Sequence, residues 1–518
     1  MTFEETLAEW MPSQRWFAGK GARILDLAIV TDTELVGGDP GLHHLIVTVS
    51  QGSAIPQGGA IPRGSAILPG SAIPRGSAIL PGSAILPGSA VLPGSTILPG
   101  SAISRGSTFS PGSTFSRNST VAQNSTVDSY QLFLGLREEL PGHLQHVMVG
   151  VADDGRIAYD ALHDPELTRL LLQAIADGGR AGPLCFAHEP GAEIDTSLES
   201  LVLTGEQSNT SMMFGEATIL KVFRRPSPGP NPDLEVPRAL AMRGSTHVAE
   251  PLGWIETRLD GASVILGILS RYLRAASDGW SLAATSVRDL YAAEGRISAA
   301  DAGGDFAGEA YRLGEATAEV HRDLARGFGA DELPPEAISA LADEMFTRLD
   351  VALATVPELG RHADVLGAAF ADLAKLDTSL SVQRVHGDYH LGQVMRTQTG
   401  WVLLDFEGEP ATPLAQRRAL ATALRDVAGM MRSFDYAARH QLLARPDGDR
   451  LHDSALEWVR RNSDAFCTGY AAAGGIDPGT HAILLRALVL DKAVYEVMYE
   501  ARNRPGWLSI PLGSIADA

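Results

Sequence analysis

Two short motifs in the last third of the chain bring together the residue types that phosphoryl transfer requires. The first, VHGDYHLGQV at Val385–Val394, carries Asp388 and, five residues later, Gln393; the second, WVLLDFEGEP at Trp401–Pro410, carries Asp405. One carboxylate must orient the attacking hydroxyl and accept its proton, while another carboxylate and a neutral oxygen hold Mg²⁺ against the nucleotide phosphates. The two motifs together supply this set.

Taken singly, a His-Gly-Asp turn or an Asp-Phe pair is an ordinary loop sequence. The order of the motifs, the 17 residues from Asp388 to Asp405 and the strand pattern between them favour the chemical interpretation. The protein-kinase template spaces its catalytic Asp and its metal-binding Asn by the same five residues, and Gln393 stands here in the place of that Asn.

The nucleotide side is expected upstream, where Thr204–Arg225 reads as strand, polar turn and strand, with Lys221 near the end of the second strand. The turn lacks a G-x-G-x-x-G loop, but its backbone amides and hydroxyls can cover phosphates. Its small polar residues are Ser208, Asn209, Thr210 and Ser211. Lys221 is predicted to contact the phosphates and to pair with Glu235 in the following helix, with Asp233 as the rival partner. A solvated strand lysine is the alternative.

The elements that must position these residues change in character along the chain. Strands are predicted at 198–203, 211–214, 217–223, 249–256 and 262–269, and helices at Pro165–Gly178 and about Asn231–Met242. From Gly279 onward the pattern is of long amphipathic helices, interrupted at 385–405. A mostly β lobe followed by a mostly α lobe predicts a bilobal α+β fold.

A tandem repeat interrupts the N-terminal part. Thirteen hexads, such as GSAILP, run in unbroken register from Gly52 to Ser129. The flanking segments His43–Ser50 and Tyr130–Leu136 have strand character and would form a hairpin without the repeat, so the hexads read as an insertion at a hairpin tip. An aliphatic residue in every hexad is compatible with a β-solenoid, whereas the Pro, Gly and Ser content favours disorder. Both interpretations stay open.

Length and charge limit the function classes. The 518 residues suggest two or three domains, and 42 Lys and Arg against 62 Asp and Glu give a net charge of −20. So acidic a surface disfavours binding to nucleic acid or to an anionic membrane. Two cysteines far apart in sequence exclude a disulfide framework and a cysteine-rich zinc site. The N-terminus lacks an apolar signal region and the uncharged run at 76–104 is broken by Pro and Gly, so a cytoplasmic protein is expected.

Beyond these patterns, the chain resembles the actinobacterial maltokinases, a branch of the aminoglycoside-phosphotransferase-like, eukaryotic-kinase-like fold. The motifs that carry the resemblance are QRWFAGKG at Gln14–Gly21, SNTS at Ser208–Ser211, LKVFRR with NPDLE at Leu220–Glu235, SDGWSLA at Ser277–Ala283, HGDYHLGQ at His386–Gln393, DFEGEP at Asp405–Pro410, RDVAGMMRSFDYAA at Arg425–Ala438 and DKAVYEVMYEARNRPGW at Asp491–Trp507. The motifs span the chain outside the repeat, which is not part of the family pattern.

The resemblance implies an ATP- and Mg²⁺-dependent transfer of the γ-phosphoryl group to the anomeric hydroxyl of maltose. The product, maltose 1-phosphate, feeds α-1,4-glucan (glycogen) synthesis in this family. The implied subdomains are a cap at 1–165 with the insertion at 52–129, an intermediate subdomain at 166–273 that completes the N-lobe and binds ATP, and a helical C-lobe at 274–518 that carries catalysis and the sugar.

The resemblance also implies roles for individual residues. By motif position, Asp388 is the catalytic base, and Gln393 and Asp405 are the metal ligands. A disaccharide site needs polar side chains and an aromatic face, and Asp491–Trp507 offers both at helical spacing. The predicted substrate-binding residues are His390, Arg432, Lys492, Tyr495, Glu496 and Tyr499. A solvated helix with ion pairs is the alternative for the C-terminal segment.

Two other functions compete with a maltokinase. A kinase of another sugar or of an aminosugar such as glucosamine would use the same phosphoryl-transfer core. A non-catalytic relative would use the repeat for assembly or binding, although the presence of Asp388, Gln393, Asp405 and Lys221 argues against it. A monomer is expected, and the repeat leaves oligomerisation open.

Overall fold

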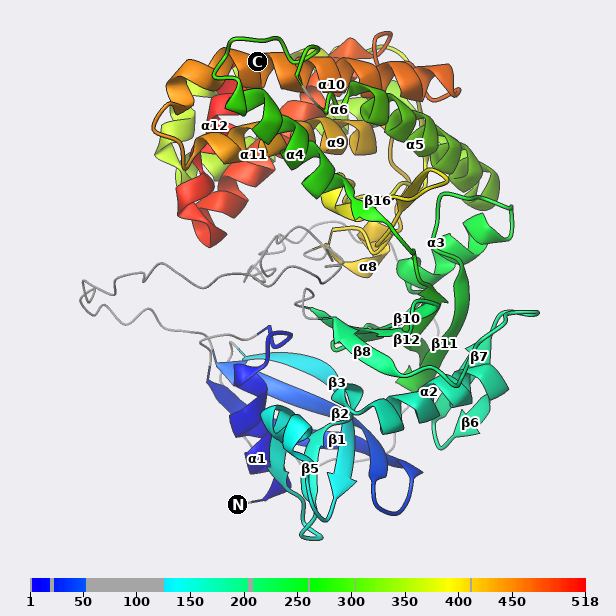
Figure 1. Ribbon diagram of the computed structural model, residues 1–518. Helices are drawn as coiled ribbons and strands as arrows, with labels where there is room; N and C mark the ends of the chain where they lie inside the picture. The colour runs from blue at the N-terminus through cyan, green and yellow to red at the C-terminus, as the bar shows by residue number, and fades with distance from the viewer. Residues whose placement is uncertain are drawn as a thin grey trace, which may run out of the picture.

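The structure, a computed structural model, describes residues 2–518 apart from 19–22, 53–124, 204–207, 260, 303 and 410–411. Three parts follow one another along the chain: a β-rich cap, a second β-rich part, here called the N-lobe, and a helical C-lobe (Figure 1). The N-lobe lies between the other two. The predicted α+β arrangement is confirmed. Within the described ranges, no helix is long and apolar enough to cross a membrane.

The cap is built on a five-stranded antiparallel sheet with the order β1-β2-β3-β5-β4. Its elements are α1 (Phe3–Trp10), β1 (Ile24–Val36), β2 (Gly41–Gly52), β3 (Ser125–Arg137), β4 (Met148–Val151) and β5 (Ile157–Asp160). Helix α1 begins at a capping box, in which Thr2 and Glu5 exchange side chain-to-backbone hydrogen bonds. Trp16, Phe17 and Tyr130 form an aromatic group in the cap core.

Strands β2 and β3 form the hairpin that the sequence predicts around the repeat. They pair along their whole length, from Gly41 opposite Leu136 to Gly52 opposite Ser125. The sequence assigns the last hexad to the insertion, whereas residues 125–129 belong to β3 because they continue its ladder. The remaining part of the predicted insertion, 53–124, and its predicted solenoid or disordered state lie outside the described residues.

The N-lobe contains a seven-stranded antiparallel sheet with the order β6-β7-β11-β12-β10-β9-β8, together with two helices. Its elements are α2 (Pro165–Asp177), β6 (Gly179–Ala181), β7 (Leu184–His188), β8 (Ser200–Leu203), β9 (Asn209–Phe214), β10 (Thr218–Phe223), α3 (Pro232–Ala241), β11 (Pro251–Leu259) and β12 (Ala262–Arg271). Leu220 and Val222 of β10 share a hydrophobic core with Ile46 and Phe133 of the cap. The cap and the N-lobe therefore pack around one core.

The two faces of the β9–β10 hairpin have different neighbours. In the antiparallel register Lys221 lies opposite Ser211, and Val222 lies opposite Thr210. Side chains alternate between the faces of a sheet. Val222 packs in the core shared with the cap, so Thr210 also faces the cap, whereas Lys221 and Ser211 face the C-lobe.

The C-lobe is mostly helical. Its helices are α4 (Gly279–Ala292), α5 (Ala307–Phe328), α6 (Pro335–Thr355), α7 (Ala363–Ala374), α8 (Leu414–Arg417), α9 (Leu424–Leu442), α10 (His452–Ala472), α11 (Ala482–Asn503) and α12 (Ser509–Ala516). Its short strands are β13 (Ser277–Asp278), β14 (Ala330–Leu333), β15 (Leu380–Gln383), β16 (Val394–Arg396) and β17 (Trp401–Leu403). Strand β16 and helix α8 lie on the side of the C-lobe toward the N-lobe (Figure 1), so the predicted catalytic motifs lie between the two lobes.

Candidate active site

The catalytic loop, Val385–Gln393, connects β15 to β16 and is shaped by its own histidine. His386 donates from Nε2 to the carbonyl oxygen of Leu404 at 2.8 Å, and its Nδ1 accepts the backbone N–H of Asp388 at 3.4 Å. These bonds fix the tautomer of the ring. They also tie the loop to the turn that carries Asp405, so His386 has a structural role in the site.

A buried aspartate of α9 holds the same loop. Asp426 accepts the backbone N–H groups of His386 at 2.7 Å and of Gly387 at 3.0 Å. It also accepts a hydrogen bond from Nε2 of His321 at 2.9 Å, and Nδ1 of His321 lies 2.8 Å from the hydroxyl of Tyr470. Burial alone would raise the pKa of Asp426, but these hydrogen bonds outweigh burial and hold the pKa below its usual value. Asp426 therefore fixes the loop as an anion.

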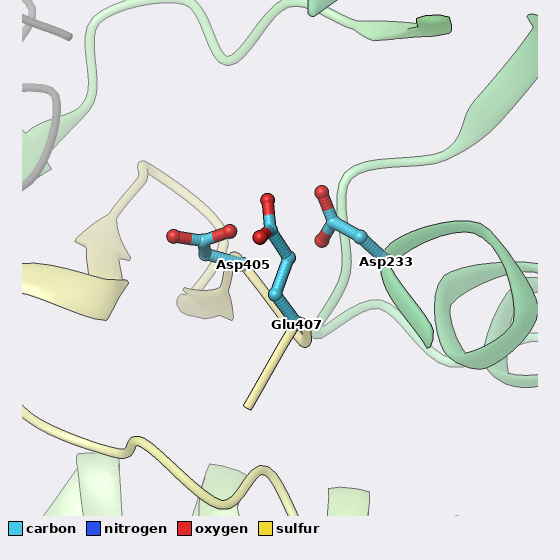
Figure 2. A group of neighbouring side chains, drawn as sticks. All are labelled: Asp233, Asp405 and Glu407. Atoms are coloured by element: carbon cyan, nitrogen blue, oxygen red, sulfur yellow. The ribbon is translucent and has the colours of Figure 1, made fainter. Parts of the chain in front are cut away.

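Lys221 joins the two lobes. Its Nζ lies 2.8 Å from a carboxylate oxygen of Asp233, near the start of α3. In the turn after β17, the same Nζ lies 2.7 Å from Asp405 and 2.6 Å from Glu407. The three carboxylates face one another (Figure 2), and each offers an oxygen within 4.8 Å of the others. One ammonium thus stands among three acidic groups, which leaves negative charge in excess at this point.

The pKa values of the three acids reflect their crowding. Burial alone would raise the pKa of Asp405, but the Lys221 ammonium outweighs burial and holds that pKa below its usual value. Burial raises the pKa of Glu407 to about 7, and the neighbouring carboxylates add to the rise while Lys221 opposes it. Burial also raises the pKa of Asp233. A divalent cation would relieve the repulsion among these carboxylates.

Gln393 completes the group. Its side-chain amide donates to the second oxygen of Asp405 at 3.2 Å. Asp405 has a left-handed backbone with φ of 61°, and such strained non-glycine residues gather at functional sites. Carboxylate and amide oxygens are the ligands that Mg²⁺ prefers in proteins. The donor set of Asp405, Gln393 and the unpredicted Glu407 therefore fits a magnesium ion.

In the described structure, the predicted ion pair between Lys221 and Glu235 is not formed, and the rival Asp233 takes that position. Glu235 binds two arginines of the C-lobe instead: Arg384 at 3.3 Å and Arg418 at 2.8 Å. The reason is the phase of α3. Residues two apart in a helix point in directions roughly 200° apart, so only one of the two acids can face Lys221. Glu235 is an inter-lobe contact and leaves the predicted ATP-binding set.

The polar turn predicted to cover the phosphates is described from Ser208 onward. Ser208 is exposed, Asn209 is half-buried, and Ser211 is buried on the face toward the C-lobe. Thr210 points the other way, because side chains alternate along β9. Its hydroxyl accepts a hydrogen bond from Nε of Arg224 at 2.8 Å. The prediction that the Thr210 hydroxyl serves the nucleotide is therefore wrong.

Helix α11, the segment predicted to bind the sugar, lies beside Asp388. Nζ of Lys492 is 3.8 Å from Asp388 and 3.6 Å from Glu409. The same ammonium lies 4.7 Å from the centroid of the Tyr495 ring, which stacks on Tyr499 with centroids 6.4 Å apart. Lys492, Tyr495 and Tyr499 are thus brought together next to the predicted base.

Arg432 and Glu496 are placed differently from the other predicted sugar contacts. Arg432 is 2% exposed, and its guanidinium donates to Glu496 at 2.6 Å, to Asp435 at 3.0 Å and to Ser514. Its donors are engaged inside the C-lobe, where they join α9 to α11 and α12. This burial corrects the predicted substrate-binding role of Arg432, and Glu496 serves the same internal pair.

His390 has a local role in the loop. Its Nδ1 accepts the backbone N–H of Gly392 at 3.0 Å, which caps the one-turn helix at Leu391–Gln393. Burial lowers the pKa of His390, while the nearby Asp388 opposes that shift. The ring is therefore held as a neutral cap close to the predicted base.

Comparison with known proteins begins with two family models. Residues 10–60 and 113–164 match the maltokinase N-terminal cap domain, and residues 203–445 match the phosphotransferase enzyme family. A glucosamine kinase of Streptacidiphilus jiangxiensis is 30% identical over 360 residues, which cover 67% of this chain and 80% of that protein. The chain belongs to the phosphotransferase enzyme family. Its N-terminal part is a maltokinase cap, which the insertion interrupts.

A second relative and a solved structure to which this chain is similar are also glucosamine kinases. A glucosamine kinase of Mycolicibacterium smegmatis (strain ATCC 700084 / mc(2)155) is 30% identical over 327 residues, 60% of this chain and 77% of that protein. A solved structure of glucosamine kinase in complex with glucosamine, ADP and inorganic phosphate is 25% identical, with a TM-score of 0.58 over 76% of this chain and 90% of that chain. The chain is therefore a sugar kinase in the broad sense, a phosphotransferase with an alcohol group as acceptor.

The sequence analysis missed three acidic residues of the candidate site, namely Glu407, Glu409 and Asp426. Glu407 and Glu409 follow Asp405 in the motif DFEGEP, and their spacing of two residues was a signal that both belong to the turn. Asp426 stands in the motif RDVAGMMRSFDYAA, where an acid among apolar residues of a helix signals a buried partner.

Proposed function

We propose that this phosphotransferase is a maltose 1-kinase, which transfers the γ-phosphoryl group of ATP to the anomeric hydroxyl of maltose. The observation that carries the proposal is the position of Asp388, whose loop is held rigidly and whose carboxylate lies beside Lys492 and the stacked Tyr495 and Tyr499 rings. Among sugars, the match of residues 10–60 and 113–164 to the maltokinase cap favours maltose.

In the proposed reaction, a carboxylate oxygen of Asp388 accepts the proton of the attacking sugar hydroxyl as the phosphoryl group is transferred. Nζ of Lys492 lies 3.8 Å from the Asp388 carboxylate and holds it beside the sugar-side residues of α11. Lys221, held in place by Asp233, contacts the nucleotide phosphates. Residues that would hold a magnesium ion are Asp405, Gln393 and Glu407. When bound, the ion supplies positive charge against the β- and γ-phosphates.

The charges on the sugar side favour a neutral substrate. Asp388 and Glu409 are acidic, and Lys492 lies 3.8 Å and 3.6 Å from them. Arg425 adds a second positive charge 3.9 Å from Glu409. Asp388 and Glu409 thus each lie near a positive charge of the protein, so the ammonium of an aminosugar would compete with Lys492 and Arg425 for these two acids. The Tyr495 ring offers a face on which pyranose C–H groups pack.

Glucosamine is the second candidate substrate, because the relatives that cover most of this chain are glucosamine kinases. An ammonium at this position would have to displace Lys492 or Arg425 from Glu409. The two candidates therefore differ in a testable way: removing the positive charge of Lys492 should hinder use of a neutral sugar and favour an aminosugar.

The deciding experiment is a phosphoryl-transfer assay with ATP and Mg²⁺ across maltose, glucose, glucosamine and trehalose. NMR of the product identifies the phosphorylated hydroxyl. We expect turnover with maltose and phosphate on the anomeric oxygen. Turnover with glucosamine in preference to maltose, or phosphate on another hydroxyl, would contradict the proposal.

A pair of variants tests the sugar side. Tyr495→Ala removes the ring and is expected to raise KM for maltose by about tenfold, whereas Tyr495→Phe keeps the ring and removes only the hydroxyl that bonds Glu409. If the two variants have the same KM for maltose as the wild-type chain, Tyr495 is not a sugar contact.

A further inference from the structure

Arg224 lies where the cap meets the N-lobe, three residues after Lys221. Its side chain is 1% exposed. Nη2 donates to Asp160 of the cap at 2.5 Å, and Nε donates to the Thr210 hydroxyl of β9 at 2.8 Å. The guanidinium also lies 5.0 Å from the centroid of the Trp16 ring in the cap. One buried side chain thus connects the cap to β9.

The backbone is joined at the same place. The N–H of Gln131 in β3 donates to the carbonyl oxygen of Arg224 at 2.9 Å. The side-chain amide of Gln131 donates to the carbonyl oxygens of Phe223 and Leu266, each at 2.5 Å. Because Gln131 is buried, these bonds are shielded from competing water. The cap therefore holds the end of β10 through its backbone and the start of β9 through Arg224.

We propose that Arg224 is a positioning residue through which the cap sets the start of β9 relative to Lys221. The inference rests on the proposed function, in which Lys221 and the residues at the start of β9 contact the nucleotide. Thr210, which Arg224 holds, directly precedes Ser211, and Ser211 lies opposite Lys221 in the register. If Thr210 moves, the backbone amides beside Lys221 move with it. Arg224 itself is too buried to contact a nucleotide, so it acts only through Thr210.

This arrangement makes the cap a part of the nucleotide site. The Thr210 hydroxyl faces the cap and the Lys221 ammonium faces the C-lobe, so the link passes through the strand from one face to the other. The sugar-side residues lie on α11, outside this link. Cutting the link should therefore weaken nucleotide binding and leave the KM for the sugar unchanged.

The cap offers a matched pair of acids for the test. Asp160 and Asp164 are each 3% exposed, each accepts a backbone N–H at the start of a helix, and each pairs with an arginine. The partner of Asp160 is Arg224, and the partner of Asp164 is Arg137, at 2.9 Å. Asparagine at either position keeps a capping oxygen and removes the charge. Only Asp160→Asn acts on Arg224.

The readout is binding of ADP to the full chain by calorimetry, together with Tm and the KM for the sugar. We expect both variants to lower Tm, and Asp160→Asn alone to weaken ADP binding by about tenfold, because it removes a charge-assisted hydrogen bond from Arg224. Equal ADP affinity in Asp160→Asn and wild type would overturn the inference, as would an equal loss in Asp164→Asn.

A milder pair covers the case in which Asp160→Asn does not fold. Thr210→Val removes only the acceptor of Arg224, and Thr210→Ser keeps it. We expect weaker ADP binding in Thr210→Val and wild-type affinity in Thr210→Ser; equal affinity in the two would contradict the inference. A wild-type chain that binds no ADP would instead contradict the proposed function. ADP binding that is unaffected by every variant leaves that function standing and removes the role of Arg224.

Discussion

The loop around Asp388 and the cluster around Lys221 meet at the turn after β17, yet they are held in opposite ways. In the loop, the backbone N–H groups are paired with Asp426 and with the ring of His386. In the cluster, three carboxylates share one ammonium. The hydrogen bonds of the loop are formed without a ligand, whereas the cluster crowds three carboxylates around one ammonium, and a further cation would relieve their repulsion.

This difference indicates a division of labour. A group that moves a proton during the reaction must be held in position beforehand, because reorganisation at that moment costs rate. A group that binds a charged cofactor can be left under repulsion, because the cofactor relieves it on binding. We therefore expect substitutions in the loop to act on kcat, and substitutions in the cluster to act on the binding of nucleotide with metal.

The largest expected effect is on the loop side, at Asp388. Asp388→Asn keeps the size of the side chain and removes the charge that accepts the sugar proton. A correctly placed base contributes roughly 10²–10⁴ in rate, so kcat should fall by that factor while ADP affinity and Tm change little. Steady-state kinetics and thermal unfolding check this. A collapse of nucleotide affinity or Tm with kcat nearly intact would mean that Asp388 is structural.

A smaller effect on kcat is expected at Asp426, which binds the backbone of the loop and not the substrate. Asp426→Asn turns one acceptor into an N–H₂ donor that opposes the N–H groups of the loop, so kcat should fall by roughly 10- to 100-fold. The KM for ATP should be unchanged. Asp435→Asn is the matched control, since Asp435 is also buried on α9 but binds Arg432 and Arg439 away from the loop. If both variants lower kcat equally, the loss comes from instability of α9 rather than from the loop.

The buried histidine His44 of the cap predicts a pH effect on the free energy of unfolding and none on catalysis. His44 lies in the cap core beside Gln131, at 3.0 Å, and burial lowers its pKa from 6.5 to about 4. Below pH 6.5 the unfolded chain binds a proton that the folded chain does not, so stability falls as the pH drops toward 4. The loss is about 3 kcal/mol in total. Denaturant unfolding at several pH values measures it.

The control for this pH effect is His44→Gln, which removes the titrating group. Its stability should depend less steeply on pH between 6.5 and 4 than that of the wild-type chain. The same slope in both chains would show that His44 is not the group responsible. The change in kcat between pH 6.5 and pH 4 should be the same in His44→Gln and in the wild-type chain.

The smallest effect is expected from the insertion. Deleting 53–124 and joining Gly52 to Ser125 by a two-residue turn keeps every pair of the β2–β3 ladder. Activity and ADP affinity should be unchanged. Deleting 52–129 also removes Asp128, which binds Arg225 at 2.6 Å, and should lower Tm. Loss of activity in the shorter deletion would show that the insertion is integrated into the cap.

The sequence predicted those features that depend on local pattern. The strand that carries Lys221, the helix after it and the hairpin around the repeat were confirmed. The polar turn was predicted to include Asn209–Ser211, but these residues begin β9, and 204–207 lie outside the described residues. Strands β1 and β4 to β7 were not predicted individually. Their burial depends on the cap and the N-lobe sharing one core, which no single segment reveals.

The errors at the site have the same origin. Choosing Asp233 over Glu235 requires the rotational phase of α3 against β10, and the direction of Thr210 requires knowing that the cap covers one face of β9. Arg432 looks like a sugar contact at helical spacing, but tertiary packing buries it against Asp435 and Glu496. Residue type and spacing thus predicted the chemistry, and packing decided which residues carry it.

The division of labour is tested most directly by ADP titrations with and without Mg²⁺ on the wild-type chain, Asp388→Asn and Asp405→Asn. Asp405 faces Lys221 at 2.7 Å and Gln393 at 3.2 Å, and a neutral amide is a poorer ligand for the ion. We predict that Mg²⁺ strengthens ADP binding in the wild-type chain and in Asp388→Asn, and that this dependence is lost in Asp405→Asn. Retention of the Mg²⁺ dependence in Asp405→Asn, or its loss in Asp388→Asn, would contradict the account.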